Sequence, residues 1–280
     1  MKQLRYDHVQ ETLYYEQLDN GLELYVLPKP GFSKTYATFT THYGSIDNHF
    51  QIEGEEPVQV PDGIAHFLEH KMFEEPDGDV FEKFSAKGAS ANAFTSFDRT
   101  TYLFSATDHI EDNLTTLLNF VQHPYFTEAS VDKEKGIIGQ EINMYQDNPD
   151  WRLYYGLLDA LFQKHPVRID IAGTIESISR ITPETLYKCH EAFYHPSNMM
   201  VFVVGGVDPQ RISELVKANQ DAKVYNRQGE IRRFYEQEPE PVTEQRKVTK
   251  LPVALPKCLI GFKEIDGTPP GAAALHKEAA

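Results

Sequence analysis

Two short apolar segments separated by a tight-turn tripeptide constrain the fold of this chain more than any other feature. The segments are residues 13–18 (LYYEQL) and 22–27 (LELYVL), and Asp19-Asn20-Gly21 lies between them. Asn-Gly is a strong signal for a two-residue hairpin turn, because both central positions of that turn need a positive φ. The N-terminal part of the chain is therefore predicted to start an antiparallel β-sheet.

The remaining segments extend this sheet and add helices. Extended patterns at 90–97 and 100–107 flank Asp98-Arg99, which predicts a second antiparallel pair. Further strands are expected at 35–45 and 199–207, and apolar residues at helical spacing predict helices at 108–122, 127–146, 151–163, 183–194 and after 208. This order predicts an α+β fold, with a mostly antiparallel sheet and helices packed on one face.

The domain organisation is predicted from a change in composition near residue 229. Residues 1–228 are expected to form an N-terminal domain, and the charged, proline-rich residues 229–256 a linker or exposed arm. A strand is predicted at 257–265, and residues 257–280 are expected to start a second, incomplete domain. The total of 280 residues exceeds one typical domain of roughly 100–200 residues.

Composition restricts the kinds of partner. The net charge of −15 disfavours nucleic acid, because phosphate binding needs a basic face. No apolar run approaches the roughly 18 residues of a membrane span, and the N-terminus has no signal-peptide pattern. Cys189 and Cys258 lie far apart, which fits a reducing compartment, so a cytoplasmic location is expected.

The segment HFLEH at 66–70 is the strongest chemical signal. His66 and His70 are four residues apart and share one face of a predicted helix, with Asp62 as its N-cap and Pro76 as its stop. Paired imidazoles suit zinc, and Glu69 lies near the same face. Chance predicts only about 0.04 occurrences of H-x-x-E-H in such a chain, so we interpret the motif as a metal site.

A catalytic zinc site usually has a third protein ligand. The predicted helix at 127–146 offers Glu134 and Glu141, which are seven residues apart and so share a face. Apolar neighbours favour Glu141, because a carboxylate in such surroundings needs a cation. Gly136 and Gly139 are expected to let another helix approach closely.

These segments together resemble a known family. HFLEH followed by EKGIIGQE at 134–141 is similar to the pitrilysin or insulinase (M16) family of zinc peptidases with an inverted motif. ASANAFTSFDRTTYLF at 89–104, AGTIESI at 172–178 and FYHPSNM at 193–199 also resemble family segments. The resemblance covers roughly residues 18–207 and is strongest to the bacterial two-domain branch, which is related to mitochondrial processing peptidase.

The resemblance implies a processing-peptidase-like metallohydrolase domain with specific roles. His66, His70 and Glu141 are expected to bind Zn²⁺, with Glu69 as the general base. Glu134 is expected to orient a ligand histidine.

The resemblance also implies how a peptide substrate binds. The strand at 90–97 is expected to be an open sheet edge to which the peptide adds as another strand, with Asn92, Ala93 and Phe94 against it. Family members carry a second, similar domain that closes over the substrate, so this chain is expected to be a fragment or to pair with another similar chain, identical or different.

Three functions remain open. The first is a zinc endopeptidase in which Glu69 takes a proton from the attacking water. The second is a non-catalytic peptide-binding or scaffold subunit of a paired complex, which the intact HFLEH disfavours. The third is a small-molecule lyase that shares the inverted motif.

Overall fold

The largest element of the structure is a seven-stranded sheet in the order β1-β2-β3-β11-β4-β10-β9. The computed structural model describes residues 1–226 and 228–263. Neighbouring strands are antiparallel, except that β11 runs parallel to β3. The strands are β1 (Lys2–Tyr6), β2 (Glu11–Gln17), β3 (Glu23–Pro28), β4 (Thr35–Thr41), β9 (Ser90–Thr95), β10 (Thr100–Ala106) and β11 (Met199–Gly205).

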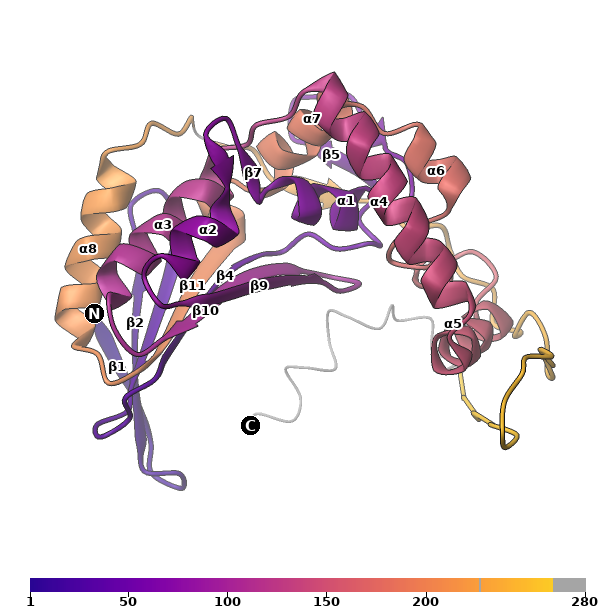
Figure 1. Cartoon of the computed structure of the whole chain (residues 1–280), viewed down its shortest axis with the longest axis horizontal. Coiled ribbons are helices and arrows are strands. Elements are labelled where there is room, and N and C mark those ends of the chain that lie inside the picture. Colours follow the sequence, from indigo (N-terminus) through magenta and orange to yellow (C-terminus); the bar gives the residue numbers. More distant parts are fainter. Residues whose placement is uncertain (227, 264–280) are drawn as a thin grey trace.

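Helices cover one face of the sheet and extend beyond it. Figure 1 shows α2, α3 and α8 beside the sheet, and α1 and α4 side by side above β9. No helix of the described residues combines the length and apolar character needed to cross a membrane. The helices are α1 (Ile64–Lys71), α2 (Val80–Ser85), α3 (Ile110–Gln122), α4 (Glu128–Gln146), α5 (Pro149–Leu161), α6 (Ile175–Ser179), α7 (Pro183–Phe193) and α8 (Pro209–Asp221), with 3₁₀ turns at Pro166–Arg168 and Pro196–Asn198.

The core lies between the sheet and these helices. Along β4, Ala37 and Phe39 are fully buried, whereas Tyr36 between the strand's buried positions is exposed. Val201 and Val203 of β11 are buried in the same alternating way. One buried and one more open face is what an antiparallel sheet with helices on one side requires. The predicted α+β class is confirmed.

The predicted hairpins are present. Leu18 N donates to Leu22 O at 2.9 Å, so the expected hairpin links β2 to β3. Gly21 adopts a φ of +91° but Asn20 has no positive φ, so the connection is not the two-residue turn that the Asn-Gly signal indicated. At the other end of the sheet, Ser96 N donates to Arg99 O at 2.7 Å and closes the β9–β10 hairpin. The predicted helices form with ends shifted by a few residues.

A second, smaller sheet joins segments in which no strand was predicted. The segment between β4 and α1 contains β5 (His49–Ile52) and β6 (Val58–Gln59). Its third strand is β12 (Ile231–Arg233), which lies in the predicted linker and pairs antiparallel with β5. These strands are only two to four residues long, which is too short for a period-2 pattern of apolar residues to be recognised.

The strand predicted at 257–265 is not formed over residues 257–263. Leu259, Ile260 and Phe262 are exposed there, and no neighbouring strand of the described residues pairs with them. A strand needs a partner for its backbone groups, so the apolar pattern alone was insufficient. The remainder of that prediction, and of the second domain expected at 257–280, lies outside the described residues.

The chain after β12 is attached to the end of α5. One carboxylate, that of Glu238, accepts hydrogen bonds from the backbone N–H groups of Gln163, Lys164 and His165 at 2.7–2.8 Å. Glu244 N donates to Ala160 O at 3.0 Å. Residues of the predicted linker therefore pack against the N-terminal domain, although most of their side chains are exposed.

Candidate metal centre

Helix α1, which carries HFLEH, begins after Gly63 and not at the predicted N-cap Asp62. Gly63 has a φ of +88°, and no side-chain cap bond forms at this end. A Cβ atom on Gly63 would lie 2.5 Å from Ala172 O, and one on Gly173 would lie 2.6 Å from Asp62 O. Close backbone approach of the two glycine segments therefore sets the start of the helix, and the N-cap prediction is wrong.

The segment AGTIESI anchors this end of α1. Ser177 Oγ donates to Asp62 O at 2.8 Å, while Asn48 Nδ2 donates to Asp62 Oδ1 at 2.6 Å. Ser177 also forms a capping box with Thr174 at the start of α6. The segment thus positions the metal helix, a role that its sequence alone did not indicate.

The C-terminal end of α1 also differs from the prediction. The helix ends at Lys71, and the next residues form a two-stranded hairpin of β7 (Glu74–Glu75) and β8 (Gly78–Asp79). Pro76 therefore lies in the turn of this hairpin and does not end the helix. Short hairpins of this kind leave almost no periodic signal in a sequence.

Helix α4 supplies the acidic residues of the site. A capping box between Thr127 and Ser130 starts it, and it packs against α1. Glu134 and Glu141 face α1, as their seven-residue spacing predicted. An added Cβ at Gly136 or Gly139 would meet no atom of another described segment within 4 Å, so the close helix approach expected there is not seen among the described residues.

Three ligand atoms converge between α1 and α4. The Nε2 atoms of His66 and His70 lie 3.8 and 3.6 Å from Glu141 Oε2, and the three residues offer ligand atoms that all lie within 4.8 Å of one another. Two ligand atoms of one tetrahedral zinc ion lie roughly 3.4 Å apart. The donor set, two imidazoles and one carboxylate, therefore fits zinc if the three side chains move slightly closer together.

Glu134 lies on the other side of His70. Its Oε1 is 3.0 Å from His70 Nδ1, and its side chain is 13% exposed. If Nδ1 carries the proton, the lone pair of Nε2 faces Glu141. The Nδ1 atom of His66 is buried without a hydrogen-bond partner in the described structure.

Glu69 is held by the edge strand. Thr95 Oγ1 donates to Glu69 Oε2 at 2.6 Å, which ties α1 to β9. Burial raises the pKa of Glu69, while the hydrogen bond from Thr95 and the charge of His70 act in the opposite direction. The carboxyl group is therefore buried beside the three converging side chains with one fixed oxygen.

The two histidines have different electrostatic environments. Burial, with a smaller effect of His70, lowers the pKa of His66 to about 3, so its imidazole is neutral at pH 7. Burial also acts downward on the pKa of His70, but the hydrogen bond to Glu134 and nearby carboxylates outweigh it and leave this pKa raised. The cluster thus presents one imidazole, that of His66, which is neutral at pH 7, and one, that of His70, whose protonated form is favoured by its carboxylate neighbours.

The predicted substrate strand β9 is an edge of the large sheet. Within residues 1–226 and 228–263 it pairs with β10 alone, and Asn92 and Phe94 are exposed. Ser96 is hydrogen-bonded to Arg99, and in an antiparallel pair every second residue of a strand bonds to its partner strand. The backbone N–H and C=O groups of Ala93, and of the residues two before and two after it, therefore point away from β10. Asn92 Oδ1 accepts from Ala93 N at 2.9 Å, so the side chain of Asn92 occupies one of these outward N–H groups.

An aromatic cluster beside Glu141 was missed. Tyr145 lies next to Glu141, and burial and the charge of Glu141 raise its pKa. Its ring stacks on Trp151 at 4.2 Å, and Trp151 Nε1 donates to Asp170. The single tryptophan of the chain, ten residues after Glu141, was the signal available in the sequence.

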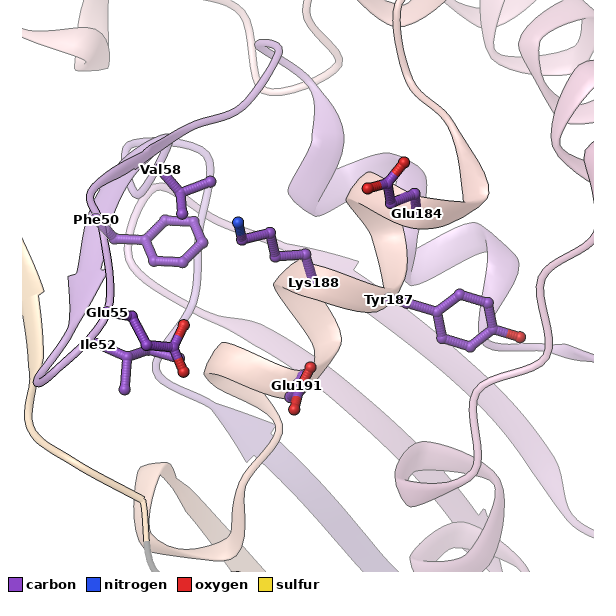
Figure 2. Close-up of a pocket in the computed structure, with 8 residues that line it drawn as sticks. All are labelled: Phe50, Ile52, Glu55, Val58, Glu184, Tyr187, Lys188 and Glu191. Carbon is purple, nitrogen blue, oxygen red and sulfur yellow. The ribbon is translucent and has the colours of Figure 1, made fainter.

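A pocket of about 370 Å³ lies elsewhere, between the small sheet and α7 (Figure 2). Apolar side chains such as Phe50 and Tyr187 line it together with Glu184, Lys188 and Glu191. It contains none of the predicted site residues. The converging side chains of His66, His70 and Glu141 therefore lie outside this pocket, between α1 and α4.

Comparison with protein families gives two matches. Residues 56–175 match the family described as insulinase (peptidase family M16), and residues 180–276 match the M16 inactive domain. The first range contains all residues of the α1–α4 cluster.

Individual relatives agree with these matches. The chain is 62% identical over 264 residues to the zinc protease YmfH of Bacillus subtilis, whose name describes it as uncharacterised, and covers 62% of that protein. A crystal structure of an M16-like peptidase from Alicyclobacillus acidocaldarius superimposes with a TM-score of 0.85 at 47% identity, over 87% of this chain and 57% of that one. The first half of the periplasmic protease PqqL from Escherichia coli gives a TM-score of 0.65 at 28% identity, over 80% and 48%. The chain thus spans about half to three fifths of the length of these relatives.

Proposed function

Because the chain belongs to the insulinase (M16) peptidase family, we propose that it carries the zinc centre and the substrate strand of a metalloendopeptidase. The observation that carries this proposal is the convergence of His66, His70 and Glu141 next to an open strand edge. Thr95 of the same strand holds Glu69, so ligands, carboxylate and peptide-binding edge form one site.

His66, His70 and Glu141 are the residues that would hold zinc. Glu134 fixes the ring of His70 through Nδ1 and so directs Nε2 toward the other two side chains. Zinc bound there supplies Lewis acidity toward a peptide carbonyl and toward water.

Glu69 is the proposed general base. Its Oε2 atom is occupied by Thr95, which leaves the other carboxylate oxygen to take a proton from the attacking water. The same carboxyl group then gives the proton to the nitrogen of the leaving amine. Burial of Glu69 excludes bulk water from this transfer.

The substrate is proposed to be a peptide in extended conformation. The outward backbone groups of β9 would pair with its main chain, which gives affinity with little dependence on sequence. Asn92 must release Ala93 N before the peptide can pair there. The exposed ring of Phe94 would lie along one face of the added strand.

A second half is expected to complete the enzyme. Peptide cleavage also needs donors that stabilise the oxyanion of the transition state. We propose that they come from a second M16-like domain or from a paired chain, identical or different. The relatives are longer than this chain, which supports the proposal.

The test uses protein produced from its complete gene, with zinc content and cleavage of a mixed-sequence fluorogenic peptide as readouts. We expect about one zinc per chain, removed together with activity by a chelator and restored with it. Glu69→Gln should keep the zinc and lose about 10²–10⁴-fold in kcat, because it removes the base but not a ligand. Glu128→Gln, an exposed residue of α4, is the matched control.

The other outcomes separate the remaining functions. Stable peptide binding without cleavage by the wild type would support the non-catalytic scaffold subunit. Zinc-dependent turnover of small thioethers but not of peptides would support a lyase. Unchanged cleavage by Glu69→Gln would contradict the assigned base.

A further inference from the structure

The chain after α8 returns to the catalytic domain as the third strand of the small sheet. Residues 230–234 are hydrogen-bonded to β5 on both sides of β12: Glu53 N donates to Glu230 O, and Phe234 N donates to His49 O, both at 2.9 Å. This segment belongs to the predicted linker. It is therefore fixed to β5, which follows the loop at residues 42–48.

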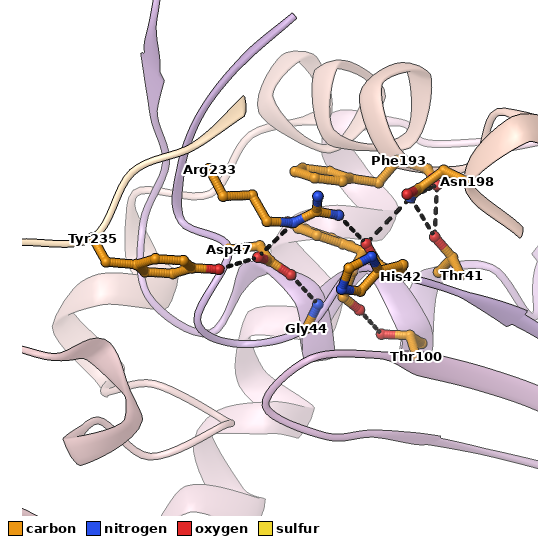
Figure 3. A network of polar contacts seen from close by, with 10 residues as sticks. Thr41, His42, Gly44, Asp47, Thr100, Phe193, Asn198, Arg233 and Tyr235 are labelled. Carbon is orange, nitrogen blue, oxygen red and sulfur yellow. Dashed lines mark hydrogen bonds and ion pairs between the residues drawn. The ribbon is translucent and has the colours of Figure 1, made fainter. Parts of the chain in front are cut away.

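A buried ion pair strengthens this attachment (Figure 3). Asp47 is 1% exposed, and its Oδ1 accepts from Arg233 Nε and from Tyr235 Oη, each at 2.9 Å. Its Oδ2 accepts from Gly44 N at 2.8 Å, and Arg233 Nη2 also donates to His42 O. We call Asp47, Arg233 and Tyr235 the Asp47 clamp. Two of its three members come from the segment after α8.

The loop held by the Asp47 clamp also holds the tip of the β9–β10 hairpin. Ser45 N donates to Ser96 O and Ile46 N donates to Phe97 O, both at 3.1 Å. Gly44 packs so closely that an added Cβ would lie 2.2 Å from Phe97 O. The loop and the hairpin tip are therefore packed main chain against main chain, so a shift of one must displace the other.

The hairpin tip leads directly to the catalytic carboxylate. Thr95 precedes Ser96 and donates to Glu69. Its cross-strand partner Thr100 donates through Oγ1 to Tyr43 O at 2.9 Å, so the loop holds both strands at this level.

We propose that Arg233, acting through Asp47, is a positioning residue that fixes the substrate strand β9 and the Thr95–Glu69 contact. The inference rests on the proposed function, in which β9 and Glu69 form the peptide site. It connects the segment that leads out of the zinc-binding domain to the geometry of that site. A partly buried arginine whose side chain is 16% exposed, beside a carboxylate at 1%, is suited to this role, because removing it leaves an unpaired buried charge that the loop must move to solvate.

The test compares Arg233→Ala with Arg232→Ala in the full-length protein. Arg232 is adjacent and exposed and makes no ion pair in the described structure, so it controls for loss of a positive charge. Hydrogen–deuterium exchange of residues 90–99 and 44–47 is measured together with zinc content and with kcat and KM for an extended peptide. We expect Arg233→Ala to speed exchange in both segments by about tenfold and to raise KM by about 10–100-fold at unchanged zinc content. Added guanidinium should partly restore KM.

Exchange in 90–99 that is the same in both variants would overturn the proposal, as would a loss of zinc in step with the loss of activity. If Arg233→Ala does not fold, Tyr235→Phe removes a single hydrogen bond to Asp47 and is judged by the same exchange in 90–99. The exchange measurement needs no hydrolysis. An inactive wild type would therefore count against the proposed function, while the coupling of Arg233 to β9 is judged separately.

Discussion

Helices α1 and α3 pack on the same domain but are stabilised in opposite ways. In α3 the buried side chains include Leu114, Leu117 and Leu118, which form one apolar face against the sheet. In α1, Glu69 and Lys71 are buried along with apolar residues. An apolar face stabilises the helix that carries it, whereas buried ionisable groups cost free energy unless they are paired. We therefore expect α1 to depend on the partners of its ionisable side chains, including any cation that they bind, and α3 to depend on apolar packing.

The largest expected effect comes from removing the third ligand on α4. Glu141→Ala should reduce zinc from about one per chain to nearly none after dialysis, because two imidazoles alone bind weakly. Zinc should then raise the melting temperature of the wild type but not of the variant, since only a bound ion stabilises the fold. Metal analysis and thermal denaturation with and without zinc check this.

Glu134→Ala is the matched control, because Glu134 touches His70 but not the converging ligand atoms. It should weaken zinc binding by about 10–100-fold without abolishing it. Full zinc occupancy in Glu141→Ala would show that another residue is the third ligand, with Glu134 as the first candidate.

A core substitution in α3 should give the converse result. Leu117 is fully buried, so Leu117→Ala should lower the free energy of unfolding by about 2–5 kcal/mol. Zinc content should remain near one per chain, because α3 supplies no ligand. Denaturant unfolding and metal analysis test this, with Asp112→Ala on the exposed face of α3 as control. Zinc lost in Leu117→Ala at a temperature where the protein is folded would show that the two helices are not independent.

The same contrast explains what the sequence could predict. The body of α3 and the β2–β3 hairpin were predicted because their signals are local: apolar spacing in one, Asn20-Gly21 in the other. The positions of His66, His70 and Glu141 also followed from spacing within single helices. Their convergence depends on how α1 and α4 pack against each other, which the spacing of residues within one helix does not determine.

The missed features depend on contacts between distant segments. The start of α1 is set by Gly63 against Ala172, so the good N-cap residue Asp62 was a misleading local signal. β12 is three residues long and exists because β5 and Asp47 pair with it, so its composition indicated a linker. Propensity is a weak guide wherever tertiary contacts decide the conformation.

The smallest expected effect tests the support of α1 by α6. Ser177→Ala removes the capping box of α6 and the hydrogen bond to Asp62 O, which should lower the free energy of unfolding by about 1–2 kcal/mol. Thr185→Ala removes the equivalent capping box of α7. The Oγ1 atom of Thr185 donates to Thr182 O and has no hydrogen bond to α1 in the described structure. Both variants should therefore lose stability, with the smaller loss in Thr185→Ala. Only Ser177→Ala should weaken zinc binding, by a few-fold, because it loosens the start of the metal helix. Zinc affinity is measured by competition with a chelator. Equal zinc affinity in the two variants would mean that Gly63 and Gly173 hold α1 in place without help from the serine.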